Sequence, residues 1–155
     1  MLEPRYFGPR STPIENRIVG DFVSRLIWGE HGQVAEYCSM GIFDGERLVA
    51  GTLYHNWQED AGVIELTSAS TTKRWLTRRV IQAMFHLPFN MLGCQMVVLR
   101  VSERNSNMVR IARSFGFTEV YIPRLYGRDE GAYVFTLTDD QWRGHRLNRP
   151  ISSEA

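Results

Sequence analysis

The spacing of apolar residues predicts a helix and then a hairpin in the first half of the chain. Residues 16–32 carry apolar side chains at helical intervals until two glycines end the pattern. The residues that set this period are Ile18, Phe22, Leu26 and Ile27. In residues 38–57, two apolar runs flank Asp44-Gly45, a dipeptide that favours a tight turn between strands. A short strand in residues 61–70 then ends in small polar residues.

The second half alternates between helical and extended patterns. Its expected elements are a helix at 73–87, a strand at 93–104, a helix at 105–117 and strands at 118–122 and 132–138. Pro88 helps to end the first helix. The second begins at a cap, Asn105 or Ser106, and ends at Gly116. Together the elements predict an α/β domain with a mixed sheet, because helices between consecutive strands must cross over.

Composition and charge fit one globular domain. The chain has 155 residues, of which 43% are hydrophobic and 23% charged, and its net charge is +1. Because the chain is not basic as a whole, any site for an anion must be local. No apolar run approaches a membrane span, and the N-terminal residues lack the core of a secretion signal. We expect a single cytoplasmic domain over residues 1–155 with a loosely ordered polar tail from about residue 143.

Cysteine and histidine positions give no metal pattern. Cys38 and Cys94 lie far apart and fit no ligand spacing. We interpret them as reduced core residues, with a disulfide as the alternative. The histidines other than His55 also form no ligand pattern, so no metal is expected.

A cluster of cations marks the start of the helix expected after residue 70. The segment STTKRWLTRRVIQAMF carries Lys73, Arg74, Arg78 and Arg79. Acidic residues are preferred at a helix N-terminus, because that end already carries positive partial charge. The cluster therefore indicates a bound anion, with a solvated surface or a nucleic-acid phosphate contact as the alternatives. Trp75 and Phe85 have core spacing, so they do not indicate base stacking.

The helix after the buried strand carries the most specific pattern. In NSNMVRIARSFGF, Asn105 lies about one helix ahead of Gly116-Phe117. This arrangement resembles the GNAT (GCN5-related) N-acetyltransferases over roughly residues 35 to 142. Phe89 and the ending FTLTDDQW are similar to the ribosomal-protein N-acetyltransferase branch. The compact, Arg-rich chain also resembles small acetyltransferase-like proteins encoded by phages.

The resemblance implies a fold and a donor. The fold would be a mixed, mostly antiparallel sheet with a splayed central strand pair, flanked by helices. Acetyl-CoA would place its pantetheine arm in that gap and its pyrophosphate on the next helix. The residues implied to hold pantetheine through the backbone are Leu66, Thr67 and Ser68. Those implied to hold the pyrophosphate are Lys73, Arg74, Trp75, Leu76, Thr77, Arg78 and Arg79, and Asn105 would both cap its helix and contact pantetheine.

Two departures from the family pattern stand out. The usual loop, Gln/Arg-x-x-Gly-x-Gly/Ala, corresponds here to residues 72–77, which contain neither Gly nor Ala. Either side chains replace the lost backbone contact, or the site binds CoA weakly or not at all. The family often carries a Tyr as general acid on the helix after the buried strand, and that position holds Ala112.

Acid–base candidates come from the strands before the cationic helix. An acidic residue near the splayed strand often serves as the family's base, which indicates Glu65, and its alternative is a solvent-facing or Arg-paired side chain. Tyr54 is the tyrosine that we assign to catalysis, while Tyr121, Tyr126 and Tyr133 lie elsewhere in the chain. His55 is an acid–base alternative with a structural role as the simpler explanation.

The resulting hypothesis is an acetyl-CoA-dependent N-acetyltransferase that transfers acetyl directly to a primary amine. No serine has a His or Asp at a recognisable spacing, which argues against an acyl-enzyme. The acceptor is a small molecule or a protein, and a homodimer is plausible. The alternatives are a GNAT-fold CoA-binding or interaction module without turnover, and a nucleic-acid-binding protein that uses residues 73–79.

Overall fold

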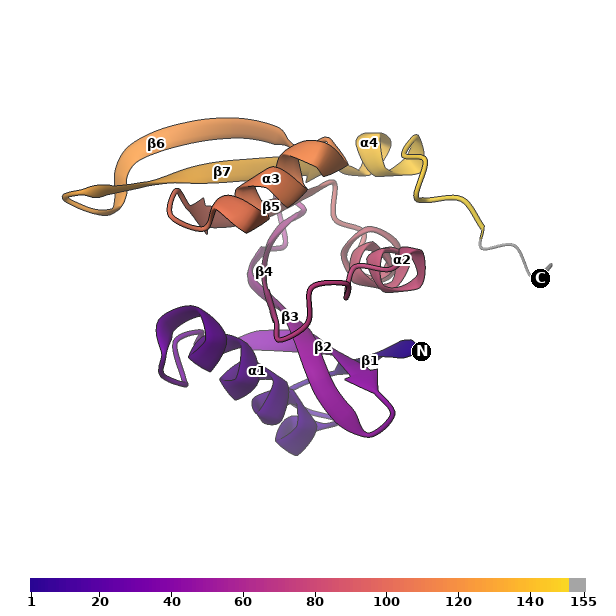
Figure 1. Ribbon diagram of the computed structural model, residues 1–155. Helices are drawn as coiled ribbons and strands as arrows, with labels where there is room; N and C mark the ends of the chain where they lie inside the picture. The colour runs from indigo at the N-terminus through magenta and orange to yellow at the C-terminus, as the bar shows by residue number, and fades with distance from the viewer. Residues whose placement is uncertain (151–155) are drawn as a thin grey trace.

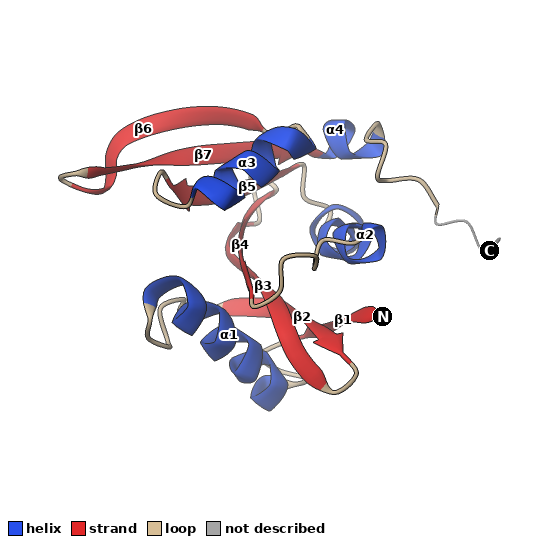
Figure 2. Ribbon diagram, viewed as in Figure 1, coloured by secondary structure: helices blue, strands red, loops and turns tan. Residues whose placement is uncertain are grey.

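One sheet organises the part of the chain that the structure describes, residues 1–150. The computed structural model has seven strands in the order β1-β2-β3-β4-β5-β7-β6 (Figures 1 and 2). The strands are β1 Leu2–Phe7, β2 Tyr37–Asp44, β3 Arg47–Gln58, β4 Val63–Ser70, β5 Met96–Ser102, β6 Thr118–Gly127 and β7 Glu130–Thr138. The helices are α1 Pro13–Trp28, α2 Arg78–His86, the π-helical turn η1 Leu87–Met91, α3 Ser106–Phe115 and α4 Asp139–Arg143. The predicted α/β class is confirmed.

The sheet is antiparallel except at its centre. β4 and β5 are parallel, and α2 with η1 forms the crossover between them. All other neighbouring strands pair antiparallel. The predicted mixed, mostly antiparallel sheet is therefore confirmed. The hairpin at Asp44-Gly45 is also present, and Gly45 has the positive φ of 65° that such a turn requires.

Helix α1 covers one face of the sheet, and of the residues that set its apolar period only Phe22 packs against the cluster beneath it. Val19 and Val23 pack against Leu53, whereas Ile18 is 55% exposed. The reason is the close approach of helix and sheet. A Cβ at Gly51 would lie 2.8 Å from Val19 and 2.9 Å from Val23, so only glycine admits this packing.

The opposite face carries α2 and α3. Val80 and Met84 of α2 pack against Tyr54 and neighbouring strand residues. Val109 of α3 packs with residues of β5 and β7. The two helices meet through aromatic side chains, including a tilted contact at 5.5 Å between the rings of Phe85 and Phe115. In Figure 1 α2 lies between the β1–β4 side and the β5–β7 side of the molecule.

The start of α2 differs from the prediction. The helix begins at Arg78, not at Lys73, because Thr77 caps it and its hydroxyl accepts from the Val80 N–H at 3.2 Å. Lys73 and Arg74 therefore lie in the preceding loop. The end of the helix is close to the prediction, although the π-helical turn continues the chain past Pro88.

The prediction for α3 is confirmed in detail. The Asn105 side chain accepts from the Met108 N–H at 3.2 Å, and Gly116 ends the helix in the left-handed conformation with φ 107°. The strands that follow are longer than expected. β6 extends to Gly127 and β7 begins at Glu130, so most of the expected loop belongs to a long hairpin.

The two ends of the described chain also depart from expectation. β1 was not predicted and adds an edge strand beside β2. The expected loose tail is wrong at its start, because His145 is hydrogen-bonded to the Phe115 carbonyl at 2.7 Å and stacks on the Phe115 ring. The segment then follows α2, where Gln82 donates to the Leu147 carbonyl at 2.9 Å. Residues 151–155 lie outside the described part.

Two further observations concern the whole described chain. No helix within residues 1–150 is long and apolar enough to cross a membrane. Both cysteines are free thiols; Cys94 is buried and Cys38 is partly buried, as expected for reduced core residues.

Candidate functional site

The central feature is a gap between β4 and β5. The two strands pair at three positions, Val63 with Met96, Ile64 with Val97 and Glu65 with Val98. Beyond these positions β4 continues along β3 to Ser70, and β5 continues along β7 to Ser102. A cleft of about 1940 Å³ follows the divergence and is lined by both strands, α2, α3 and the end of α1. The predicted splayed strand pair is thus present.

Backbone groups of both strands point into this gap. Groups along a strand face its two neighbours alternately. The Thr71 N–H donates to Val49 on β3, so Leu66 and Ser68, which lie out of phase with it, face the gap. On β5 the Met96 N–H donates to Gly62 on the β4 side, so Arg100 faces the gap too. The backbone role proposed for Leu66 and Ser68 is compatible with this geometry.

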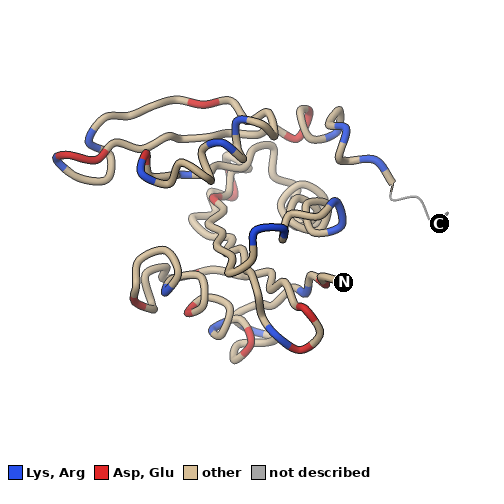
Figure 3. Tube along the Cα trace, in the orientation of Figure 1, with Lys and Arg blue, Asp and Glu red and all other residues tan. Residues whose placement is uncertain are grey.

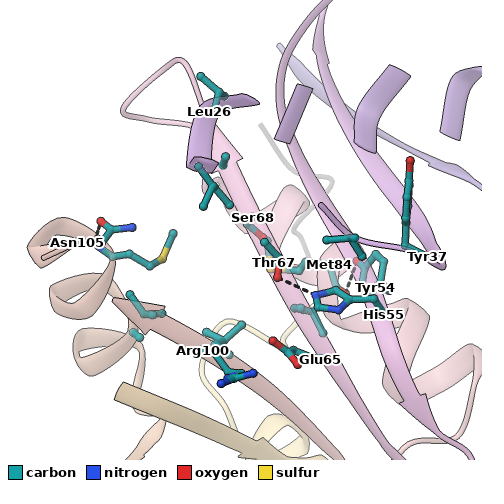
Figure 4. A pocket seen from close by; sticks show the side chains of 18 of the residues that line it. Leu26, Tyr37, Tyr54, His55, Glu65, Thr67, Ser68, Met84, Arg100 and Asn105 are labelled. Atoms are coloured by element: carbon teal, nitrogen blue, oxygen red, sulfur yellow. Dashed lines mark hydrogen bonds between the residues drawn. The ribbon is translucent and has the colours of Figure 1, made fainter. Parts of the chain in front are cut away.

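Thr67 is a correction to the sequence-based set. Its backbone faces β3, where it pairs with Leu53, and therefore does not face the gap. Its side chain contributes instead. The Thr67 Oγ1 lies 2.7 Å from the His55 Nε2, and Figure 4 shows this hydrogen bond as a dashed line.

A polar group lies on the face of the gap that α1 borders. His55 on β3 is the cross-strand partner of Glu65 on β4, and in Figure 4 the side chains of Glu65 and Arg100 enter the same space from opposite strands. Burial lowers the pKa of His55, Glu65 opposes this change and Arg100 adds to it. The ring is therefore neutral at neutral pH and can accept a proton. Within residues 1–150, the Glu65 carboxylate accepts one hydrogen bond, a long contact from the Asn56 side chain at 3.4 Å.

Tyr54 does not fit the catalytic role that the sequence analysis gave it. It is 1% exposed, and its hydroxyl donates to the Met84 carbonyl on α2 at 2.7 Å. Burial raises the pKa of Tyr54 well above the ordinary value. This hydrogen bond joins α2 to the sheet. Tyr54 and His55 are neighbours on β3 and therefore project from opposite faces, so Tyr54 does not belong to the polar group around His55.

The cationic segment is divided by the structure. Figure 3 shows cations on the loop between β4 and α2 and at the start of α2. Of these, Lys73 lines the cleft, whereas Arg74, Arg78 and Arg79 do not. Arg79 approaches Glu3 at 3.7 Å on the side of β1. Among the cations implied to hold the pyrophosphate, Lys73 therefore lies at the cleft, and the phosphate contacts of Arg74, Arg78 and Arg79 stay predictions.

The other residues expected to hold pyrophosphate have different positions. Trp75 is buried in the core next to α2, and both Trp75 and Leu76 line the cleft. The Thr77 N–H donates to the Trp75 carbonyl at 3.0 Å, so this amide is occupied. Within residues 1–150 the N–H groups of Arg78 and Arg79 have no acceptor, as at any helix start.

Two further cleft residues matter for the site. Asn105 lines the cleft at the start of α3, as expected, with its side-chain oxygen on the helix N–H. Tyr126 of β6 was not assigned a role from the sequence, and its hydroxyl donates to the gap-facing Arg100 carbonyl at 3.0 Å. A local pattern could not have revealed this contact, because the two residues are 26 positions apart. No cluster of three His, Cys, Asp or Glu side chains suited to a metal ion occurs in the described chain.

Solved structures share this fold. The sequence itself matches no family model and no curated protein. A mutant form of the spermidine/spermine N-acetyltransferase SpeG from Vibrio cholerae superposes with a TM-score of 0.70 at 12% identity, over 91% of this chain and 96% of that one. A chimera of the same enzyme with hSSAT gives 0.72 at 12% identity over 93% and 99%. A dodecameric structure of spermidine N-acetyltransferase from Vibrio cholerae in an intermediate state gives a TM-score of 0.61 at 14% identity, over 70% of this chain and 68% of that one. The chain therefore has the fold of the GNAT acetyltransferases, as its resemblance implied.

Proposed function

We propose that this protein is an acetyl-CoA-dependent N-acetyltransferase that moves an acetyl group directly to the primary amine of an acceptor. The observation that carries the proposal is the parting of β4 from β5 after Glu65 and Val98, with backbone groups turned into the space between them. An extended chain with amide groups can add to such an edge as another strand. The pantetheine arm has this character, and the acetyltransferases that share the fold support it.

The residues around the gap fit this donor. The cleft exceeds the roughly 300–1,000 Å³ common for small-molecule sites, as a long donor and an acceptor together require. Lys73, the cation of residues 73–79 that lines the cleft, would hold the phosphates. The segment that lacks the family's glycines lies at this cleft, because Trp75 and Leu76 both line it.

The polar group beside the gap supplies acid–base chemistry. Acetyl-CoA would bring an acetyl group already activated as a thioester. Glu65 would remove the amine proton, directly or through a water molecule. His55, held by Thr67 and kept neutral by burial, is the second proton acceptor next to it. Direct transfer is the simpler proposal, because within the described residues the hydroxyl paired with His55 belongs to Thr67 and not to a serine or cysteine.

The acceptor is proposed from the same surroundings. Glu36, Glu65 and Glu130 line the cleft together with Trp28 and Trp57, a setting that suits a positively charged amine. Spermidine is the acceptor named for the enzymes that share the fold, so polyamines are the first compounds to test. Lysine and N-terminal peptides and aminoglycosides complete the panel.

The test is release of free thiol from acetyl-CoA with each amine of this panel. We expect release with at least one amine, and a loss of about 100-fold in Glu65→Gln, the lower end of a general base's contribution. Glu59→Gln is the matched control, because Glu59 is exposed in the turn after β3 and does not line the cleft. Binding of acetyl-CoA without thiol release from any amine would instead indicate a module that binds without turnover.

A further inference from the structure

The proposed reaction still lacks a residue that gives a proton to the leaving thiolate. A thiolate that leaves at neutral pH is helped by a proton, because an ordinary thiol has a pKa of about 8.5. The family position that often supplies this proton holds Ala112 here. We propose that Tyr126, which reaches the gap from β6, is the general acid that protonates the leaving thiolate. This inference rests on the proposed function and adds a catalytic residue to it.

An irregular segment of β6 brings Tyr126 to the gap. The pairing of β6 with β7 is regular up to Ile122 with Ala132 and returns only at Gly127 with Glu130. Residues 123–126 therefore form an arch opposite Gly131, and Arg124 in this arch has a φ of 65°, which is uncommon for a residue with a side chain. In a regular strand Tyr126 would lie about 10 Å from β5, because β7 lies between β6 and β5.

The arch places the Tyr126 hydroxyl where β5 leaves β4. It donates to the Arg100 carbonyl at 3.0 Å, and this carbonyl faces the gap two residues beyond Val98, the last β5 residue paired with β4. Tyr126 as a whole is 41% exposed, and it lines the cleft. A ligand that adds to the edge of β4 would therefore lie next to this hydroxyl.

The other tyrosines do not match this position. Tyr54 is buried on the opposite face with its proton on Met84. Tyr121 donates to Glu103 at 2.7 Å and does not line the cleft. Tyr37 lines the cleft from β2, where its hydroxyl lies beside Gly20 of α1. Tyr126 is thus the cleft tyrosine whose hydroxyl lies on the β5 margin of the gap.

Burial and the charges around Tyr126 keep its hydroxyl protonated. Burial raises its pKa, Arg100 opposes this change, and Glu65 and Glu130 add to it. The phenol is therefore protonated at neutral pH. The guanidinium of Arg100 lies 5.8 Å from the centre of the Tyr126 ring, where it can stabilise a phenolate after the proton has left.

The step balances with the groups already named. The amine nitrogen forms a bond to the thioester carbonyl carbon, and the carbon–sulfur bond breaks with its electron pair remaining on sulfur. Tyr126 gives its hydroxyl proton to that sulfur, while Glu65 takes a proton from the amine. Glu65 then returns a proton to Tyr126 through solvent, so the products are an acetylated amine and a free thiol.

The test compares Tyr126→Phe with Tyr121→Phe in the whole chain. Both changes remove one hydroxyl from β6, and Tyr121 lies outside the cleft. We expect Tyr126→Phe to lower kcat about 100-fold with little change in KM, and to remove the decline of kcat at high pH. A near-ultraviolet difference spectrum adds a readout apart from turnover. Coenzyme A should perturb a tyrosine signal in the wild type and in Tyr121→Phe, but not in Tyr126→Phe.

The outcomes separate this inference from the proposed function. An unchanged kcat in Tyr126→Phe, with the wild type active, would overturn the inference alone. A raised KM with unchanged kcat would also overturn it, because that result belongs to a residue that only shapes the cleft. Absence of coenzyme A binding and of thiol release in the wild type would instead overturn the proposed function.

Discussion

Replacement of Lys73 by alanine should weaken coenzyme A binding, whereas replacement of Arg79 should not. Lys73 lines the cleft at the end of β4, and Arg79 lies outside it with Glu3 at 3.7 Å. A hydrogen bond from a charged group contributes about 1.5–3 kcal/mol. Lys73 is exposed, so solvent screens the contact and the lower end applies. A loss of about 1.5 kcal/mol corresponds to roughly a tenfold rise in Kd.

Isothermal titration with coenzyme A measures this difference directly. The Lys73→Ala effect should shrink as salt is raised, because it comes from a screened charge. Arg79→Ala is the matched control, since both variants remove one cation from residues 73–79. An Arg79→Ala effect equal to or larger than that of Lys73→Ala would refute the division of the cationic segment described above.

Three other predictions concern the residues around the gap. Tyr54→Phe should leave kcat within about twofold and cost about 1 kcal/mol of unfolding free energy in urea, because it loses one buried hydrogen bond to Met84; a large fall in kcat with unchanged stability would restore Tyr54 as a catalytic residue. Thr77→Ala should cost about 1 kcal/mol through loss of the α2 cap, and Thr77→Ser should restore it; an alanine variant as stable as the wild type would place the helix start elsewhere. Burial lowers the pKa of His55, so below about pH 6.5 the unfolded chain binds a proton that the folded chain does not. The free energy of unfolding should therefore decrease as the pH is lowered through this range, and it should decrease less in His55→Gln. Parallel curves for the two proteins would contradict the burial of a neutral His55.

Local sequence patterns predicted the elements whose ends are set by their own residues. Asn105 and Gly116 bound α3 because one side chain can cap a helix and glycine readily adopts a left-handed conformation. The Asp44-Gly45 turn is equally local. Edge strand β1 was missed, because its pairing depends on β2 and its short sequence contains Pro4.

Patterns failed where distant segments decide the outcome. The apolar period of α1 is correct, yet the buried stripe is chosen by Gly51 on β3, far away in the sequence. Tyr54 was assigned to catalysis from the sequence, but its hydroxyl donates to the Met84 carbonyl on α2. Tyr126 lies in a segment that was expected to be a loop, and the arch in β6 brings its hydroxyl to the Arg100 carbonyl. Glu65 remains the candidate general base, because the strand predicted from the sequence places it at the last pair between β4 and β5.

The most direct test of the central claim is thermal unfolding with acetyl-CoA and with ATP as an anion control. A ligand at about 100 times its Kd stabilises the folded state by roughly 2.7 kcal/mol. We expect a rise in Tm with acetyl-CoA well beyond that with ATP, because the proposed site between β4 and β5 would bind the pantetheine arm and not only phosphate. Equal shifts, or no shift with either compound, would contradict it.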